Sequence, residues 1–168
     1  MAAGATYEPI QTTTLGSEVN SVTLSSISSA YTDLILVGYT QQDASLDTPN
    51  IRFNGDTSAN YSTLIFSGSA TVIASTRGSN ENFIYGGYYA VPPTPDNFGT
   101  MILHINNYAN TNIKKTVIVK AGRDTGGIDL HQGYWNSTAA INSITLFMSQ
   151  NTKWAVGTTF TLYGIAAA

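Results

Sequence analysis

The stretch YTDLILVGY, residues 31–39, is nearly all apolar or β-branched. A continuous apolar run of this kind is typical of a strand in the middle of a sheet, where both faces are covered. We therefore expect residues 31–39 to form a central β-strand that is buried on both faces.

Strand-like segments lie on both sides of this run. In residues 19–24, Val22 and Leu24 fall on one face of an extended chain and the residues between them on the other. Turn signals such as Asn54-Gly55-Asp56 recur about every 8–15 residues, a spacing typical of sandwiches and barrels. The other expected strands are residues 51–53, 61–66, 70–75, 82–91, 100–105, 114–121, 128–135, 141–148 and 158–165.

About ten strands without an amphipathic helical pattern predict an all-β protein. The expected fold is an antiparallel two-sheet β-sandwich, jelly-roll-like in its connectivity. Trp135 and Trp154 are expected to pack in the core or at its rim.

Residues 1–16 differ in composition from the rest. They contain Pro9 and three consecutive threonines, with only Tyr7 and Ile10 as apolar anchors. We expect an extended N-terminal arm here, followed by a single β-sandwich domain in residues 17–168. Such an arm either reaches a neighbouring subunit or adds a strand to the edge of its own domain. The composition leaves both open, and our prediction is that the arm docks on a neighbour.

Charged residues make up 10% of the chain, whereas an average protein has about 25%. Neutral hydrogen bonds and packing must therefore carry most of the stability. A surface with so few charges does little to keep a monomer soluble, so one interpretation is that much of it is buried in an assembly. The alternative is a monomer whose surface is covered with hydroxyl and amide groups.

The net charge of −3 argues against a nucleic-acid partner, which needs clustered Lys and Arg. The closest approach to a basic cluster is Lys114, Lys115, Lys120 and Arg123. Asp124 and Asp129 follow at once and offset these charges. We expect no membrane partner, because no stretch approaches the 18 apolar residues of a spanning helix, and the N-terminus has no signal-peptide pattern.

The residues offer little for catalysis, so we expect no enzyme, no cofactor and no metal. The chain has no cysteine, and its carboxylates are scattered among turn formers. Asp124-Thr125-Gly126 matches the aspartic-protease signature but lacks the apolar strand that should lead into it. His131 stands two residues from Asp129, so the two could share a strand face, which is half of a metal site.

The tyrosines are the positive evidence for binding. There are 10 in the chain, and Tyr85, Tyr88 and Tyr89 cluster in one expected strand. Tyrosine buries a large area and keeps one polar end, which suits protein interfaces and sugar stacking. The alternative is a sheet face covered with aromatic rings. The candidate interface residues are therefore Tyr7, Ile10, Tyr85, Tyr88 and Tyr89.

Several stretches carry a resemblance over nearly the whole chain from Tyr31. They are residues 31–38, the motif RFNGD at 52–56 with NYS at 60–62, and the closing segments WNSTAAI at 135–141, ITL at 144–146 and GTTFTLYGI at 157–165. Together these segments resemble small virion proteins of tailed bacteriophages, especially phages of cyanobacteria and other aquatic bacteria.

The resemblance implies a structural role in the virion and no catalytic residues. Proteins of this kind are β-sandwiches that form trimers and serve as capsid decoration (cement) proteins or as parts of fibres. The first hypothesis is a decoration protein on the capsid surface, a homotrimer whose other partner is the major capsid protein or another virion protein. The alternative is a tail or head fibre or adhesin domain that stacks a host-surface carbohydrate on rings such as Tyr88 or Trp135. A third hypothesis, a small glycoside hydrolase or lyase, would need two facing carboxylates.

Overall fold

The structure is a computed structural model, and it describes residues 6–43, 47–92, 97–124, 126–150 and 152–165. These residues form twelve strands and one 3-10 turn, η1. The elements are β1 (Tyr7–Thr14), β2 (Ser21–Leu24), β3 (Asp33–Thr40), β4 (Pro49–Phe53), β5 (Tyr61–Ser69), β6 (Ile73–Glu81), β7 (Ile84–Tyr85), η1 (Tyr88–Ala90), β8 (Gly99–Ile105), β9 (Lys115–Arg123), β10 (Gly127–Trp135), β11 (Ile144–Met148) and β12 (Thr159–Ile165). No helix among the described residues is long and apolar enough to cross a membrane.

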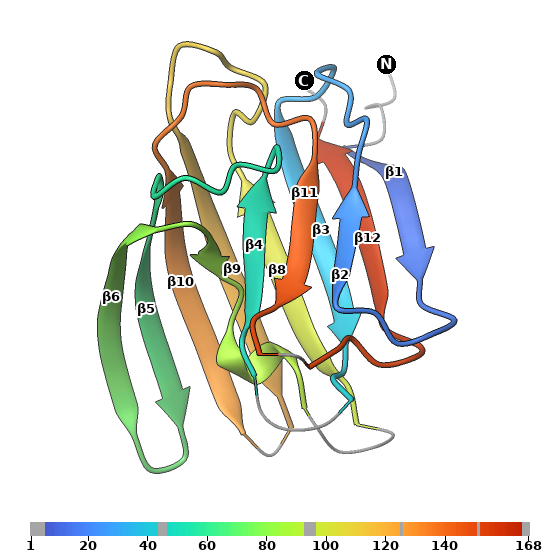
Figure 1. Ribbon diagram of the computed structural model, residues 1–168, viewed down its shortest axis with the longest axis vertical. Coiled ribbons are helices and arrows are strands. Elements are labelled where there is room, and N and C mark those ends of the chain that lie inside the picture. Colours follow the sequence, from blue (N-terminus) through green and yellow to red (C-terminus); the bar gives the residue numbers. More distant parts are fainter. Residues whose placement is uncertain (1–5, 44–46, 93–96, 125, 151, 166–168) are drawn as a thin grey trace.

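The strands form two antiparallel sheets packed face to face (Figure 1). The large sheet has the order β1-β12-β3-β8-β9-β10-β5-β6, and the small sheet has the order β2-β11-β4-β7. The pairs β3–β12, β4–β11 and β5–β10 join strands from the two halves of the chain. The expected all-β fold with two antiparallel sheets is confirmed, while the jelly-roll description stays a prediction.

The core lies between the sheets and follows the alternation of the strands. Along β8, for example, Met101, Leu103 and Ile105 are fully buried, and the residues between them are partly exposed. Both tryptophans lie in this core as expected, Trp154 at 0% exposure and Trp135 at 2%. Period-two patterning therefore located most of the inward-facing positions.

The strand at residues 31–39 is central but is not buried on both faces, so that expectation was wrong. Strand β3 lies between β12 and β8. Its inward residues Leu34 and Leu36 are fully buried, while Ile35 and Val37 are partly exposed and Tyr39 is 55% exposed. No strand or helix of the described residues covers the outer face of this strand, because the small sheet packs against its inner face (Figure 1) and only the Phe98 ring, stacked on Tyr39, is known to lie against an outer residue.

The N-terminal segment takes the second of the two arrangements left open. Residues 7–14 form β1, which pairs with β12 at the edge of the chain's own large sheet. The register shifts between Pro9 and Gln11, as expected where a proline interrupts the ladder at an edge. Residues 1–5 lie outside the described residues.

The strand expected over residues 82–91 was wrong in its extent. Only Ile84–Tyr85 form strand β7, and Tyr88–Ala90 form the 3-10 turn. Gly87 separates them with a φ of +104°, a conformation that side chains rarely adopt. The apolar and aromatic residues of this segment predicted one long strand, but the glycines among them break it.

The Asn54-Gly55 signal forms the expected tight turn. Both residues have positive φ, +53° and +66°, and the Asp56 amide donates to the Phe53 carbonyl at 2.9 Å. This is the geometry of a type I′ turn. It leads the chain from β4 in the small sheet towards β5 in the large one.

The Asp56 carboxylate holds this crossing in place. It accepts hydrogen bonds from the Trp135 indole Nε1 at 2.8 Å, the Asn60 amide Nδ2 at 3.1 Å and the Ser58 backbone at 2.9 Å. Burial by itself would raise the pKa of Asp56, but these donors together lower the pKa to about 2.

Asp47 fastens the other end of the sandwich in a similar way. Its carboxylate accepts from the Ser149 hydroxyl at 2.5 Å, the Thr152 hydroxyl at 2.7 Å and the Gln150 amide at 2.8 Å. Burial opposes ionisation, yet these donors hold the pKa of Asp47 below its ordinary value of 3.8. These hydrogen bonds join the segment just before β4 to the connection between β11 and β12.

We expect the protein to lose stability in acid through these two carboxylates. Because both pKa values are depressed in the folded state, the stabilisation is complete above about pH 5 and is lost as the pH falls towards 2. Urea unfolding at several pH values should show this slope, and Asp56→Asn should flatten it. The control is Glu18→Gln, at a side chain that is 46% exposed. An equal slope in both variants would contradict the assignment to Asp56.

Lys115 is a buried lysine with a structural role. The residue is fully buried, and its Nζ donates to the carbonyls of Asn110 at 2.6 Å, Ile113 at 2.7 Å and Thr138 at 3.0 Å. Burial lowers the pKa of this ammonium. Its three donors match three carbonyls and join the loop before β9 to the loop after β10.

Replacing Lys115 by methionine should lower the free energy of unfolding by about 1–2 kcal/mol, because three loop carbonyls lose their shared charged donor. The matched control is Lys114→Met at the exposed neighbouring residue, which should change stability by less than about 0.5 kcal/mol. Urea denaturation measures both. Equal stabilities of the two variants would show that the Lys115 bonds contribute nothing.

Candidate interaction surface

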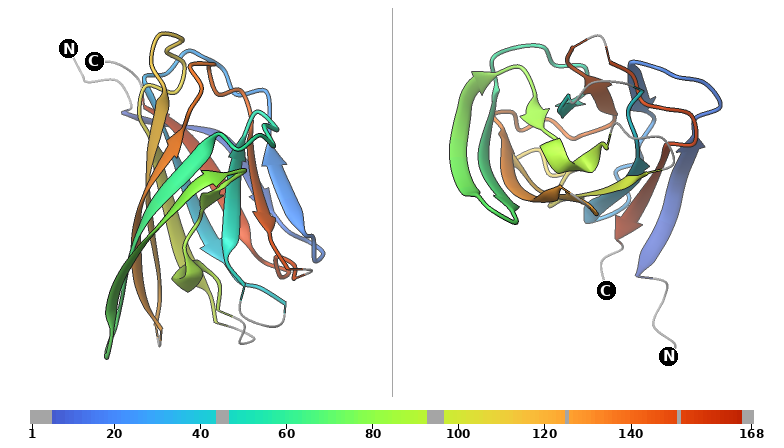
Figure 2. Two further views of the ribbon diagram at one scale, coloured as in Figure 1. Left: turned by 60° about the vertical axis from the view of Figure 1, so that its left-hand side comes forward. Right: turned by 90° about the horizontal axis from the view of Figure 1, so that it is seen from below.

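The outer face of the large sheet is the face turned away from the small sheet. No strand or helix of the described residues lies over it (Figure 2). The large sheet has eight strands and the small sheet four, so even the inner face is uncovered at the flanks. Strand β6, at one flank, is exposed along nearly all its length.

Exposed apolar side chains gather on the outer face. They are Leu64 (53% exposed) and Phe66 (48%) on β5, Ile73 (75%) on β6, and Ile128 (66%) and Leu130 (48%) on β10. The strand register makes them neighbours, since Phe66 lies opposite Leu130 and Gly68 lies between Ile73 and Ile128. We call these five side chains the apolar patch. Single exposed apolar residues are ordinary, but a contiguous group marks a contact surface.

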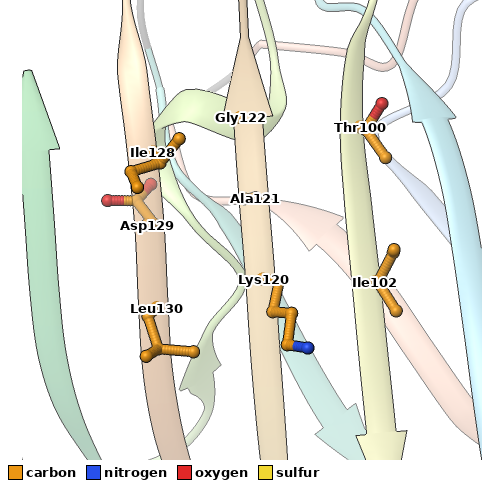
Figure 3. A pocket seen from close by; sticks show the side chains of 8 residues that line it. All are labelled: Thr100, Ile102, Lys120, Ala121, Gly122, Ile128, Asp129 and Leu130. Carbon is orange, nitrogen blue, oxygen red and sulfur yellow. The ribbon is translucent and has the colours of Figure 1, made fainter.

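Two hollows flank Ile128 on this face. One of about 380 Å³ lies over β8, β9 and β10 and is lined by Thr100, Ile102, Lys120, Ala121, Gly122, Ile128, Asp129 and Leu130 (Figure 3). The other, of about 570 Å³, lies between β5, β6 and β10. Each hollow lies over a glycine, Gly122 in the first and Gly68 in the second. The surface therefore alternates between projecting isoleucines and glycine hollows.

The basic residues do not form one surface. Lys115 is buried, and Lys120 points to the outer face opposite Leu130. The Arg123 guanidinium lies over the rings of Tyr88 and Tyr89, 5.4 Å and 5.3 Å from their centroids. Two basic side chains border the apolar patch, Lys120 opposite Leu130 and Arg77 opposite Leu64.

The tyrosine cluster expected from the sequence lies on the other side of the large sheet. Turn η1 packs against β8, β9 and β10 and carries Tyr88 and Tyr89, whose rings meet edge to face at 5.2 Å. Tyr85 lies on β7, with its ring 5.0 Å from Phe83. Tyr88 is the most exposed of the three tyrosines, at 37%, and the other two are half-buried.

A buried carboxylate anchors η1. Asp129 accepts from the Tyr89 amide at 2.8 Å and from the Ser67 hydroxyl at 2.5 Å. As the sequence indicated, His131 shares its strand face, with Nε2 3.7 Å from the Asp129 carboxylate. Burial would raise the pKa of Asp129, but His131, Ser67 and the Tyr89 amide lower it.

This pair does not extend to a metal site in the described residues, which contain no group of three or more potential ligands. The His131 Nδ1 lies 3.1 Å from the Tyr85 carbonyl, so this nitrogen must carry a proton to make the bond. The arrangement therefore positions the segment from Tyr85 to Tyr89 against the sheet.

Tyr7 and Ile10 lie apart from the tyrosines, on edge strand β1. Tyr7 is 54% exposed, with its ring 6.4 Å from that of Tyr163, while Ile10 packs partly into the core. The five residues proposed from the sequence therefore occupy separate places rather than one site.

The sequence analysis did not identify the apolar patch. A signal was present, because Leu64, Ile65 and Phe66 are consecutive apolar residues and must point to both faces of their strand.

The chain was compared with protein-family models, with curated proteins and with solved structures, and none of the three comparisons gave a match.

Removing the Asp129 anchor should loosen η1. In Asp129→Ala, the amides of residues 88–90 should exchange with deuterium at least tenfold faster, because Tyr89 loses its acceptor. The control is Leu130→Ala, whose side chain points to the opposite face. Hydrogen-exchange mass spectrometry reads the segment directly, and unchanged protection would rule out this anchoring role.

Proposed function

We propose that this chain is a structural protein of a tailed-phage virion, a capsid decoration protein that self-associates and binds the head shell. The apolar patch is the observation that carries the proposal. A chain with so few charges and an uncovered, apolar sheet face is typical of a protein whose surface is buried in an assembly. The resemblance to small phage virion proteins supplies the kind of assembly and its expected trimer.

The energetics favour burial of this face in a contact. Fully burying a Leu, Ile or Phe side chain contributes about 1.5–3 kcal/mol. The five patch residues keep between 48% and 75% of their surface exposed, so roughly half or more of that contribution remains available. A decoration protein uses such energy by mass action, because it binds the assembled lattice and stabilises it.

The carboxylates give no support to the hydrolase hypothesis. Asp47, Asp56 and Asp129 each accept several hydrogen bonds that fasten loops or turns. Each also has a lowered pKa, the opposite of what a general acid requires.

The fibre or adhesin alternative depends on exposed aromatic rings. Trp135 is 2% exposed and its indole donates to Asp56, so its ring cannot stack on a sugar. Tyr88 remains an exposed ring for that purpose, with Arg123 beside it. Tyr7 and Tyr39 are also more than half exposed, but they lie on β1 and β3, and such scattered rings support this alternative less than the contiguous patch supports an assembly contact.

Cryo-electron microscopy of whole virions, with the chain located in the map, tests the proposal. Density at repeated positions over the capsid shell is the expected result, and it would also identify the major capsid protein as a partner. Density confined to the tail or to a fibre tip would contradict decoration and favour receptor binding. A glycan-array screen with the purified protein, comparing Tyr88→Ala with the unmodified chain, would then follow.

A further inference from the structure

We propose that a second copy of this chain packs face to face on the apolar patch, with the two large sheets related by a two-fold axis. The axis runs parallel to the strands, between β9 and β10. This inference deepens the proposed function, which requires self-association, by naming the surface and its occupant. The argument rests on the strand register of the large sheet.

One cross-strand row of the outer face sets Ile128 between two glycines, Gly68 and Gly122. From β6 to β3 the row reads Ile73, Gly68, Ile128, Gly122, Thr100 and Tyr39. Ile73, Ile128 and Tyr39 are more than half exposed. The glycines on both sides of Ile128 leave it as a projecting side chain between two hollows.

The centre of this row, Ile128 beside Gly122, is complementary to itself when the row is reversed. Rotation about the proposed axis places Ile128 over Gly122 of the second copy, and the reverse contact follows by symmetry. The same rotation places Gly68 opposite Thr100. Ile73 then meets Tyr39, whose ring is already fixed by stacking on Phe98 at 4.4 Å. No shift of register is needed to make these contacts together.

The next row along the strands fits the same rotation. It contains Phe66, Leu130, Lys120 and Ile102 in that order across β5, β10, β9 and β8. Reversal places Phe66 opposite Ile102 and Leu130 opposite the aliphatic stem of Lys120. Because β9 lies next to the axis, the two Lys120 ammonium groups come close to each other there, while each stem packs on Leu130 of the other copy.

The hollows are real space for a side chain. A Cβ built on Gly122 meets its nearest atoms, the Gly127 carbonyl and an Ile128 methyl, at 3.4 Å and 3.5 Å. A Cβ on Gly68 meets only Ile128, at 3.9 Å. Neither glycine is required by a positive φ or by a close backbone approach, so both positions are open on the outer side.

The area suits a stable pair. With the axis between β9 and β10, six of the eight strands overlap. Six strands about 4.8 Å apart, each of roughly eight residues at about 3.3 Å per residue, cover on the order of 750 Å². A standard interface takes about 800 Å² from each partner.

The sequence of β3 points the same way. Residues 31–39 have the continuous apolar pattern of a strand buried on both faces, yet in the single chain Ile35, Val37 and Tyr39 keep exposed surface. In the face-to-face pair the outer side of β3 lies against β6 of the second copy. There Tyr39 meets Ile73, whereas Val37 and Ile35 meet the polar side chains of Ser75 and Arg77, so the pair covers the outer side of β3 and matches its apolar pattern at Tyr39.

Engineered disulfides test the geometry, because the chain has no cysteine of its own. Equal amounts of Ile128→Cys and Gly122→Cys proteins, mixed and oxidised, should give a mixed disulfide dimer on non-reducing gels. The matched control mixes Ile128→Cys with Val156→Cys, another side chain that is 55% exposed but lies in the loop before β12. Equal cross-linking in both mixtures, or none in the first, would overturn the face-to-face arrangement.

Sedimentation velocity supplies the second measurement. Ile128→Asp should weaken self-association at least tenfold, whereas Val156→Asp should leave it unchanged, and circular dichroism should show the β fold in both. Raising the salt concentration should strengthen the pair, because two Lys120 ammonium groups approach each other near the axis. Unchanged association of Ile128→Asp would exclude the patch as the self-association surface.

These outcomes are separable from the test of the proposed function. Failure of the cross-link with the chain still located on capsids would overturn only the two-fold contact. A confirmed pair with no density on virions would overturn only the decoration role. A two-fold contact gives dimers, or dihedral assemblies when the chain also forms the expected trimer.

Discussion

The packing of a four-stranded sheet on an eight-stranded sheet is the constraint on which the rest of this structure depends. It buries one face of the central strands and leaves the other face to solvent or to a partner (Figures 1 and 2). The unequal widths also leave β1 and β6 exposed as edge strands. Core stability and an available binding face therefore have the same origin, since the chain has too few strands to cover both faces of its large sheet.

The chain has few charged side chains, and several of them make hydrogen bonds that hold loops against strands. Asp47, Asp56 and Asp129 accept hydrogen bonds from hydroxyl, indole and backbone donors, and Lys115 donates to three carbonyls. These groups join loops to strands at places where the sheets do not pair. A surface left with hydroxyl and amide groups has little charge repulsion to keep copies apart. Low charge and an apolar sheet face thus favour the same behaviour, which is association.

The outer face unites the sequence resemblance and the structure in one functional proposal. A virion decoration protein needs contacts to its own copies and to a shell, and it needs no reactive site. The apolar patch offers the first of these, with isoleucines and glycine hollows arranged so that two copies can interlock. Arg123 with Tyr88 and Tyr89 of η1 forms a separate basic and aromatic feature, and Arg123 also lines the second hollow.

The sequence by itself determined the all-β class, most strands, the Asn54-Gly55 turn and the inward positions, because alternation and turn chemistry are local properties. It also placed Asp129 and His131 on one strand face. Only the tertiary structure decided which sheet each strand joins, that residues 7–14 pair with β12, and that Tyr85 is separated from Tyr88 and Tyr89. It alone revealed the apolar patch, because exposure depends on whether another layer of the fold covers a residue, and no local pattern records that.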